Sequence, residues 1–220
     1  MTQDWRTASR QSARLVPLAK DDREARIQIY SAKAFDWRGK FSVHCWIAYK
    51  EENADSYWVF HVTAWGDGTN LDRVVSMKKD LPDRYWYGNK PQIVCMINGK
   101  RAQKIIPKLQ LAIDSYPFWQ TYKAFPGPNS NTFVSFVMRR THGFYGNLPS
   151  NAIGKDWLTT KYFFDLSESR TGIQFSLNGL LGFTIGLLDG IEINILGLCF
   201  GIDFLYPALK LPIIGRIGFK

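Results

Sequence analysis

The stretch "FPGPNSNTFVSFVMRR", residues 125–140, joins a rigid loop to an apolar segment with helical spacing. Its two prolines each fix φ, and the glycine between them lets the backbone approach a neighbour closely. The apolar spacing predicts a helix over residues 130–140. Asn129 is the predicted cap, because an Asn side-chain oxygen accepts amide hydrogen bonds from the first turn. The sequence therefore predicts that a rigid loop presents Ser130 at the start of a helix.

The N-terminal end of this predicted helix is suited to chemistry. Its free amides and positive end stabilise negative charge that develops beside Ser130. A serine hydroxyl is a weak nucleophile at neutral pH, so it requires an adjacent general base. The rigid loop exceeds what a helix start requires and suits a preorganised oxyanion or ligand site. A plain helix start, in which Asn129 and Ser130 only begin the helix, is the alternative.

The bulk composition indicates a basic globular protein. Among 220 residues, 28 Lys and Arg stand against 19 Asp and Glu, a net charge of +9, and hydrophobic residues make up 45%. A basic balance fits nucleic acid, an anionic membrane or an acidic substrate. The basic residues occur at most in adjacent pairs, without RNA-binding or zinc-finger signatures, which argues against nucleic acid.

The cysteine pattern argues against structural cross-links. The three cysteines, Cys45, Cys95 and Cys199, include no C-x-x-C pair. We therefore expect free thiols, with neither a disulfide framework nor a metal site. The sequence carries no cofactor motif, so we expect no cofactor.

Segments before the helix predict an antiparallel sheet. Apolar alternation and β-branched residues predict strands over residues 26–35, 39–50, 57–66 and 71–79. A further helix is predicted over residues 99–117, in which Pro107 requires a kink or a break. With the helix over 130–140, these elements predict an α+β fold, an antiparallel sheet with two helices packed on it.

The C-terminal segment contains a short repeat. "GIQFSLNGL" (172–180) returns as "GIEINILGL" (190–198), and each copy alternates apolar and polar residues as a strand does. Asp189-Gly190 between them is a turn signal. An ordinary sheet with one buried face is the simplest interpretation. The alternative is peripheral contact with anionic lipid, because polar residues and glycines make residues 171–188 a poor spanning helix.

The chain divides by composition into three parts. We predict a polar N-terminal arm over residues 1–25, an α+β core over 26–165 and a β-rich extension over 166–220 that packs on the core. The arm has no apolar stretch of signal-peptide length. We therefore expect a cytoplasmic protein, with peripheral membrane contact as the alternative, and the sequence leaves its oligomeric state open.

Two of the three histidines fall in the predicted hairpin of 39–50 and 57–66. If its loop is centred between residues 52 and 53, His44 and His61 lie directly opposite each other on one face. A slip of one residue would separate them. We predict His44 as general base, His61 as its orienting partner and Ser130 as nucleophile.

Three longer motifs carry a resemblance to a known family. "PGPNSNTF" (126–133), "AIGKDWL" (152–158) and "LPIIGRIGF" (211–219) together resemble a bacterial family of unknown function. The resemblance runs from about residue 26 to the C-terminus and implies no established activity.

A remoter resemblance implies a fold and a mechanism. "NSNTFV" (129–134) is similar to the Asn-Cys-Glu-His-Phe-Val box of lecithin retinol acyltransferase-like proteins. These share a circularly permuted papain-like fold with the NlpC-type peptidoglycan amidases. Their order is a His on an early strand, a polar residue, often His, on the next strand, and a nucleophilic Cys at a helix start. His44, His61 and Ser130 follow that order, but Ser130 replaces a Cys that ionises far more readily.

Three functions follow from these patterns. The first is an amide or ester hydrolase or acyl transferase with a serine nucleophile. The second is a catalytically inactive module that binds a small molecule, a lipid, a peptide or a cell-wall fragment. The third is a peripheral membrane protein held by its C-terminal sheet. The ligand-binding candidates are Asn129, Asn131, Trp46 and Trp65.

Other residues have weaker signals. Asp156 could supply a carboxylate to either histidine, although a surface turn is the simpler interpretation. His142, Arg139 and Arg140 are expected at a solvated helix end. The further aromatic candidates for a substrate groove are Tyr85, Trp86 and Trp119.

Overall fold

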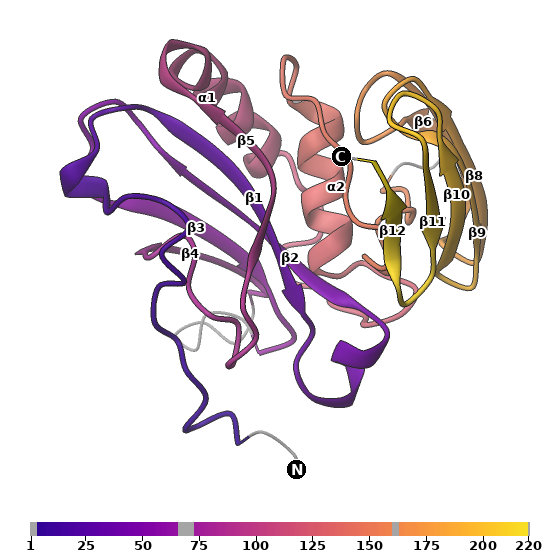
Figure 1. The fold of residues 1–220 in the computed structure, drawn as a ribbon, viewed down its shortest axis with the longest axis horizontal. Helices are drawn as coiled ribbons and strands as arrows, with labels where there is room; N and C mark the ends of the chain where they lie inside the picture. Colours follow the sequence, from indigo (N-terminus) through magenta and orange to yellow (C-terminus); the bar gives the residue numbers. More distant parts are fainter. Residues whose placement is uncertain (1–3, 66–72, 160–162, 220) are drawn as a thin grey trace.

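The computed structural model describes residues 4–65, 73–159 and 163–219. The first sheet is antiparallel, with strand order β4-β3-β2-β1-β5 (Figure 1). Its strands are β1 (Arg26–Lys33), β2 (Val43–Lys50), β3 (Tyr57–Val62), β4 (Val75–Asp80) and β5 (Gln92–Asn98), and two short 3-10 turns, η1 (Ala19–Asp21) and η2 (Asp36–Lys40), flank β1.

The strands agree with the sequence predictions in order but not in every boundary. β3 ends at Val62, and the predicted strand end at Gly66 lies outside the described residues. The edge strand β5 was not predicted. Among the described strands it pairs with β1 alone, and the aromatic, turn-rich segment before it obscures its start in the sequence.

The two helices pack on one face of this sheet. They are α1 (Gly99–Asp114) and α2 (Ser130–Arg140), and α2 has the predicted bounds. A break at Pro107 is absent, because α1 is continuous through it. Pro107 lies on the exposed side, where water hydrates the carbonyl that a proline leaves without a donor.

Strand alternation divides the first sheet between two apolar layers. Ile29, Cys45 and Ile47 point toward the helices and join their apolar faces in the main core. Tyr30 and Trp46 point to the opposite face, where residues of the N-terminal segment pack against them. That segment is attached through Asp83, whose carboxylate accepts hydrogen bonds from the Ser12 hydroxyl and the Leu15 amide. The residues from 4 to 25 therefore cover part of the sheet.

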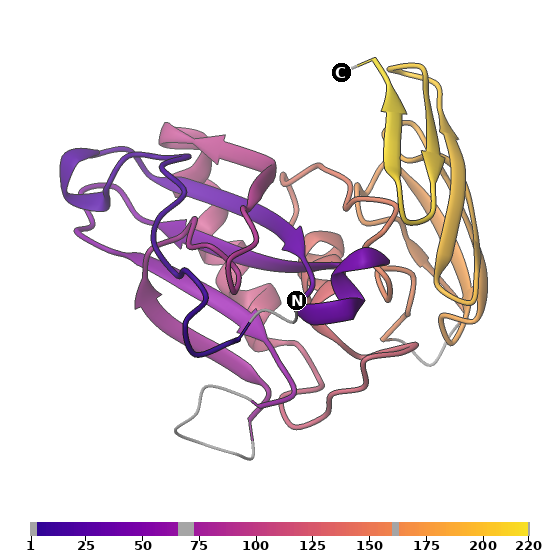
Figure 2. The same ribbon diagram turned by 60° about the horizontal axis from the view of Figure 1, so that its bottom comes forward.

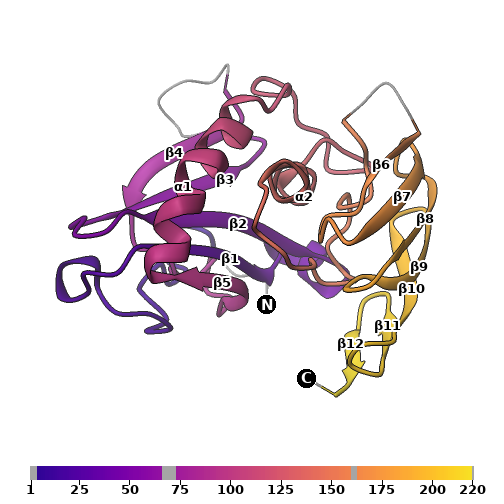
Figure 3. The ribbon, with the colours of Figure 1, turned by 90° about the horizontal axis from the view of Figure 1, so that it is seen from above.

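The C-terminal residues form a second antiparallel sheet, a meander in which each strand pairs with the next. Figure 2 shows it as a separate layer, and Figures 1 and 3 show α2 between the two sheets. Its strands are β6 (Phe164–Leu166), β7 (Gly172–Leu177), β8 (Leu181–Gly186), β9 (Gly190–Ile195), β10 (Leu198–Asp203), β11 (Ala208–Leu211) and β12 (Gly215–Gly218). The two sequence repeats begin with β7 and β9, which β8 separates.

The second sheet is inverted relative to an ordinary half-buried sheet. An antiparallel sheet commonly packs its apolar face on the core and exposes its polar face. Here the polar side chains of Gln174, Thr184, Glu192 and Lys210 are buried, while the apolar residues that alternate with them point outward. The ordinary sheet that the repeat predicts is thus present with its two faces exchanged.

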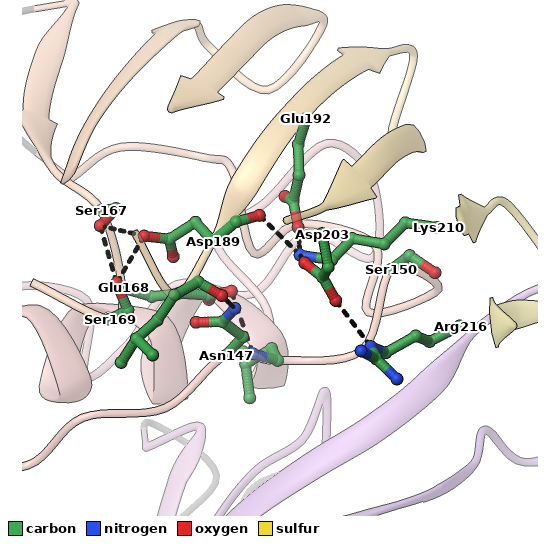
Figure 4. Close-up of polar contacts among 12 residues, drawn as sticks. Asn147, Ser150, Ser167, Glu168, Ser169, Asp189, Glu192, Asp203, Lys210 and Arg216 are labelled. Atoms are coloured by element: carbon green, nitrogen blue, oxygen red, sulfur yellow. Dashed lines mark hydrogen bonds and ion pairs between the residues drawn. The ribbon is translucent and has the colours of Figure 1, made fainter. Parts of the chain in front are cut away.

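Buried charges hold this polar face to the rest of the chain. Lys155 Nζ lies 2.8 Å from a Glu192 oxygen, and Lys210 Nζ lies 2.8 Å from the other. Burial acts to raise the pKa of Glu192, but the two ammonium groups outweigh it and lower the pKa to about 2. Figure 4 shows Lys210 beside both Glu192 and Asp203, and Arg216 beside Asp203. These ion pairs take the place of an apolar core beneath the sheet.

Arg139 is the second link, and its predicted position at a solvated helix end is wrong. The side chain is 2% exposed and donates to the Leu166 and Lys155 carbonyl oxygens at 3.0 Å and to the Gln174 side chain. Arg140, by contrast, is half-exposed and pairs with Asp165. Arg140 is the one residue of α2 that is not buried, and its partner Asp165 lies in β6 at the edge of the second sheet.

Together the two sheets and two helices confirm an α+β fold that is mostly β. Within the described ranges, no helix is long and apolar enough to cross a membrane. The predicted division at residues 25 and 165 stays a prediction.

Candidate functional site

The candidate site forms where β2 and β3 separate. The two strands pair only over Ile47–Tyr49 and Trp58–Phe60. Beyond that point the Asn131 side chain takes over the open edge of β2. Its Oδ1 accepts from the Cys45 amide at 3.1 Å, and its Nδ2 donates to the Val43 carbonyl at 3.0 Å. Asn131 thereby docks the start of α2 against the β2 residues that flank His44.

The two histidines meet on one face, although not in the predicted register. Ala48 lies opposite Val59, whereas the prediction placed Trp46 there. This is a slip of two residues, and an even slip keeps every side chain on its face. His44 Nε2 and His61 Nδ1 therefore still approach to 3.0 Å, and the rings stack with centroids 5.3 Å apart.

An aromatic shell encloses the histidine pair. The Trp86 ring lies parallel to His44, with centroids 3.8 Å apart, and also stacks on His61 at 5.0 Å. Burial lowers the pKa of His44, and the neighbouring His61 lowers it further. Burial also lowers the pKa of His61 to about 3, with a smaller contribution from the positive charge of Arg84. Both imidazoles are therefore neutral at pH 7.

Asn129 caps α2 as predicted, and its side-chain oxygen accepts hydrogen bonds from two of the free amides in the first turn of the helix. Its Oδ1 accepts from the Asn131 amide at 2.9 Å and the Thr132 amide at 3.1 Å. Its Nδ2 donates to the Ala124 and Ile153 carbonyl oxygens, both at 3.1 Å. The cap thus fixes the loop before the helix as well as the helix itself.

A glycine makes room for this cap. Gly154 has φ +93°, and a Cβ there would lie 2.4 Å from Asn129 Nδ2. Any larger residue would displace the amide, so the glycine of the "AIGKDWL" motif has a packing role.

Ser130 lies at the mouth of the helix with its polar groups available. The residue is 5% exposed. Within the described part of the chain, neither its hydroxyl nor its amide has a hydrogen-bond partner. The amides of residues 131 and 132 are already occupied, so the N–H of Ser130 itself is the first-turn donor left for an anion. The hydroxyl and this amide could act on the same bound group.

One pocket of about 290 Å³ brings these groups together. His44, Asn129, Ser130, Asn131 and Trp65 all line it, whereas His61 lies behind His44. Aromatic side chains are the largest group in the remaining wall, among them Phe35, Trp37, Trp86, Tyr122 and Phe125, and Arg38 also lines it. The pocket therefore suits a ligand that is apolar over most of its surface and has one polar group.

Several predicted site residues lie elsewhere. Trp46 does not line the pocket: it is 1% exposed, lies beneath the histidines and donates its Nε1 hydrogen to the Pro82 carbonyl. Tyr85 and Trp119 are also not lining residues, whereas Trp86 is. Cys45 faces the helix side, opposite His44, as strand alternation predicts. Its thiol is free and buried.

Asp156 and His142 also stand apart from the histidine pair. Asp156 is not at the surface as expected, because it is 2% exposed, and burial raises its pKa to about 6. No hydrogen bond joins it to His44 or His61 within the described ranges. His142 is exposed beyond the end of α2.

Sequence reasoning missed most of the aromatic wall. Tyr122 and Phe125 lie within the four residues before the Pro-Gly-Pro loop, so their proximity to Ser130 could be predicted from the sequence. Phe35 and Trp37 come from the β1–β2 connection around η2. No local pattern connects that segment with residue 130, and only the fold brings them together.

The fold and the site define a class: an α+β protein with an aromatic-lined pocket at the N-terminus of a buried helix. The chain belongs to the family described as "Protein of unknown function (DUF3750)", whose model matches residues 24–157. That range contains the first sheet, both helices and every pocket residue, and it ends before β6. Comparison with curated proteins gave no match, and comparison with solved structures gave none.

Proposed function

We propose that the protein is an amide or ester hydrolase or acyl transferase, with Ser130 as nucleophile, His44 as general base and His61 as its orienting residue. One observation carries the proposal. A single pocket contains a serine with a free hydroxyl at a helix start and a histidine already held by a second histidine. The permuted papain-like arrangement of strand His, strand His and helix-start nucleophile fits this order, with Ser in place of Cys.

The hydrogen-bond pattern of His44 supports its role as base. It contacts His61 through Nε2, so its Nδ1 has no partner among the described residues. A neutral imidazole with Nε2–H donated to His61 carries its lone pair on Nδ1, where it can accept a proton. The lowered pKa keeps His44 in this neutral form at pH 7.

The reaction then proceeds in two steps. The Ser130 oxygen attacks the substrate carbonyl carbon while His44 Nδ1 takes the hydroxyl proton. The oxyanion lies at the N–H of Ser130 and the positive end of α2. His44 returns the proton to the leaving amine or alcohol, and an acyl-serine remains. Water or an acceptor alcohol or amine then releases the acyl group, with His44 again acting as base.

The Ser130 hydroxyl does not hydrogen-bond His44 in this structure. The mechanism therefore requires a rotation of the Ser130 side chain toward the imidazole when substrate binds. Catalytic hydrogen bonds commonly tighten only in the substrate complex, so this requirement is consistent with the proposal.

A fluorophosphonate probe tests the proposal, with intact mass and peptide mapping as readout. The wild type should acquire one adduct on Ser130, and Ser130→Ala should acquire none. His44→Gln should slow labelling about 100-fold or more, the usual contribution of a general base. Ser115→Ala is the matched control, since Ser115 is exposed but lies at the C-terminal end of α1. Labelling that survives Ser130→Ala, or a wild type that is never labelled, would refute the assignment.

A second variant tests the replacement, by Ser130, of the nucleophilic cysteine that the permuted papain-like proteins carry at the helix start. Ser130→Cys places a thiol at the helix start, where the helix end favours the thiolate. Iodoacetamide should alkylate this thiol before the three native cysteines, because burial raises the pKa of Cys45, of Cys95 and of Cys199. Equal or slower alkylation at position 130 would show that the site does not activate a nucleophile.

The aromatic wall favours a second candidate function, the binding of an apolar ligand without turnover. In that case Ser130→Ala should leave the affinity for a fluorescent fatty acid unchanged, and neither protein should react with the fluorophosphonate. Trp65→Ala should weaken binding, because Trp65 lines the pocket and is 47% exposed. Turnover that Ser130→Ala abolishes would exclude this candidate.

A further inference from the structure

The outer face of the second sheet is apolar along three registered rows of side chains. The cross-strand pairs place Phe164, Phe175, Phe183, Ile193 and Phe200 in one row. A second row runs through Leu166, Ile173, Ile185, Ile191, Ile202, Leu209 and Ile217. A third row contains Leu177, Leu181, Ile195 and Leu198. We call this surface the apolar face.

The apolar face has no cover within the described chain. Figures 1, 2 and 3 show no element on the side of the second sheet that points away from α2. Its residues are accordingly exposed, for example Ile185 at 48% and Ile193 at 49%. Six or seven strands of about six residues make a surface of roughly 30 by 20 Å, at the upper end of apolar patches on soluble monomers. A surface of this kind marks an interaction site.

The apolar character continues around both ends of the strands. The turns at one end expose Leu180, Leu196, Ile213 and Ile214, and the turns at the other end expose Leu187, Phe204, Leu205 and Phe219. A second flat sheet would cover the face but leave these turns in water. Acyl chains conform to a surface and contact face and turns alike.

The apolar face also lacks what a protein interface requires. Protein interfaces carry about one hydrogen bond per 100–200 Å², but the three rows contain no polar side chain. The charged residues between 163 and 219 all have partners, and none belongs to a row. A partner protein would find no group there to set its register, whereas a lipid phase needs none.

The net charge of the whole chain, +9, favours an anionic bilayer, because anionic headgroups attract a basic protein as a whole. The segment that forms the second sheet, residues 163–219, contains three Lys and Arg against five Asp and Glu, a net charge of −2, so this attraction comes from the rest of the chain.

We propose that the apolar face docks on an anionic lipid bilayer, with the side chains of its three rows and of the flanking turns in the acyl region of one leaflet. The buried ion pairs on the opposite face keep the polar side chains of the sheet away from lipid. This is a peripheral contact, in which side chains and not the backbone enter the hydrocarbon. It is independent of the hydrolase proposal.

Vesicle flotation tests the docking with the full chain. Wild type should float with vesicles of phosphatidylcholine and phosphatidylglycerol at a 7:3 ratio in low salt. Ile185→Glu with Ile193→Glu should lower the bound fraction at least tenfold, because two charges would enter the acyl region. Met77→Glu with Leu111→Glu is the matched control: it adds the same charge at apolar residues that are 53% and 70% exposed away from the second sheet. This control should float as wild type does.

Three results would overturn the proposal. The wild type fails to float, or the Ile185 and Ile193 double variant floats as well as wild type. In the third, light scattering without lipid finds a wild-type dimer that this double variant separates into monomers, which assigns the face to a second copy. Circular dichroism should show both double variants folded, since all four side chains point to solvent.

Discussion

The side chain of Asn129 is the best single test of how the site is held. Asn129→Ala removes the acceptor that caps α2 and two donations that tie the helix start to Ala124 and Ile153. Loss of an N-cap costs about 1 kcal/mol, and each further buried hydrogen bond about 1 kcal/mol. Because the residue is only 4% exposed, water cannot replace these bonds. The expected loss is about 3 kcal/mol in the free energy of unfolding, or about 9 °C in Tm for a chain of this length.

Two companion variants separate the contributions. Asn129→Ser keeps a good capping oxygen but loses both donations, so it should lose about 2 kcal/mol. Asn98→Ala is the matched control, because Asn98 precedes α1 in the same capping position, is exposed and makes no capping hydrogen bond. It should change stability by less than about 0.5 kcal/mol.

Urea unfolding followed by circular dichroism measures all three variants. The expected order of stability loss is Asn129→Ala, then Asn129→Ser, then Asn98→Ala. The reasoning fails if Asn129→Ala loses less than about 1 kcal/mol, or if the two alanine variants lose the same amount. The first result would mean that the loop holds α2 without the Asn129 cap. The second would mean that the hydrogen bonds of Asn129 add nothing to the stability cost of an alanine at a capping position.

Two further predictions concern buried ionisable side chains. Folding lowers the pKa of His61 from 6.5 to about 3. Between these two pH values His61 is protonated in the unfolded chain and neutral in the folded chain. The contribution of neutral His61 to stability is therefore fully present above pH 6.5 and is lost as the pH falls toward 3. His61→Gln should make the unfolding free energy depend less steeply on pH over this range. Parallel curves for the variant and the wild type would contradict the prediction. Arg139→Met should lose about 3 kcal/mol in urea unfolding, because buried acceptors lose their donor, whereas half-exposed Arg140→Met should lose no more than about 1 kcal/mol. Equal losses would show that the buried hydrogen bonds of Arg139 contribute no more to stability than the pair of Arg140 with Asp165.

Local signals in the sequence determined the helix that carries the site. The Pro-Gly-Pro loop, the Asn129 cap and the apolar spacing predicted α2 with the bounds that it has. These features act within one turn of chain, so they need no distant partner. Strand alternation likewise placed His44 and His61 on one face, because a period of two survives an even slip in register.

The register itself and the aromatic wall were decided by tertiary structure. Asn131 holds the edge of β2 where β3 departs, and that contact spans 86 residues of sequence to the Cys45 amide. No local pattern reports on such a contact. The wall likewise unites Phe35 with Phe125, which are distant in the chain and adjacent only in the fold.

The inversion of the second sheet shows the same division most clearly. Alternation in the repeats predicted strands with one apolar and one polar face, and both are present. Which face is buried depends on what lies beneath. Beneath the second sheet lie two buried cations. Lys155 forms an ion pair with Glu192, and Arg139 donates a hydrogen bond to Gln174. A buried charge is stable only with a partner, so these two residues draw the polar face inward and leave the apolar face outside.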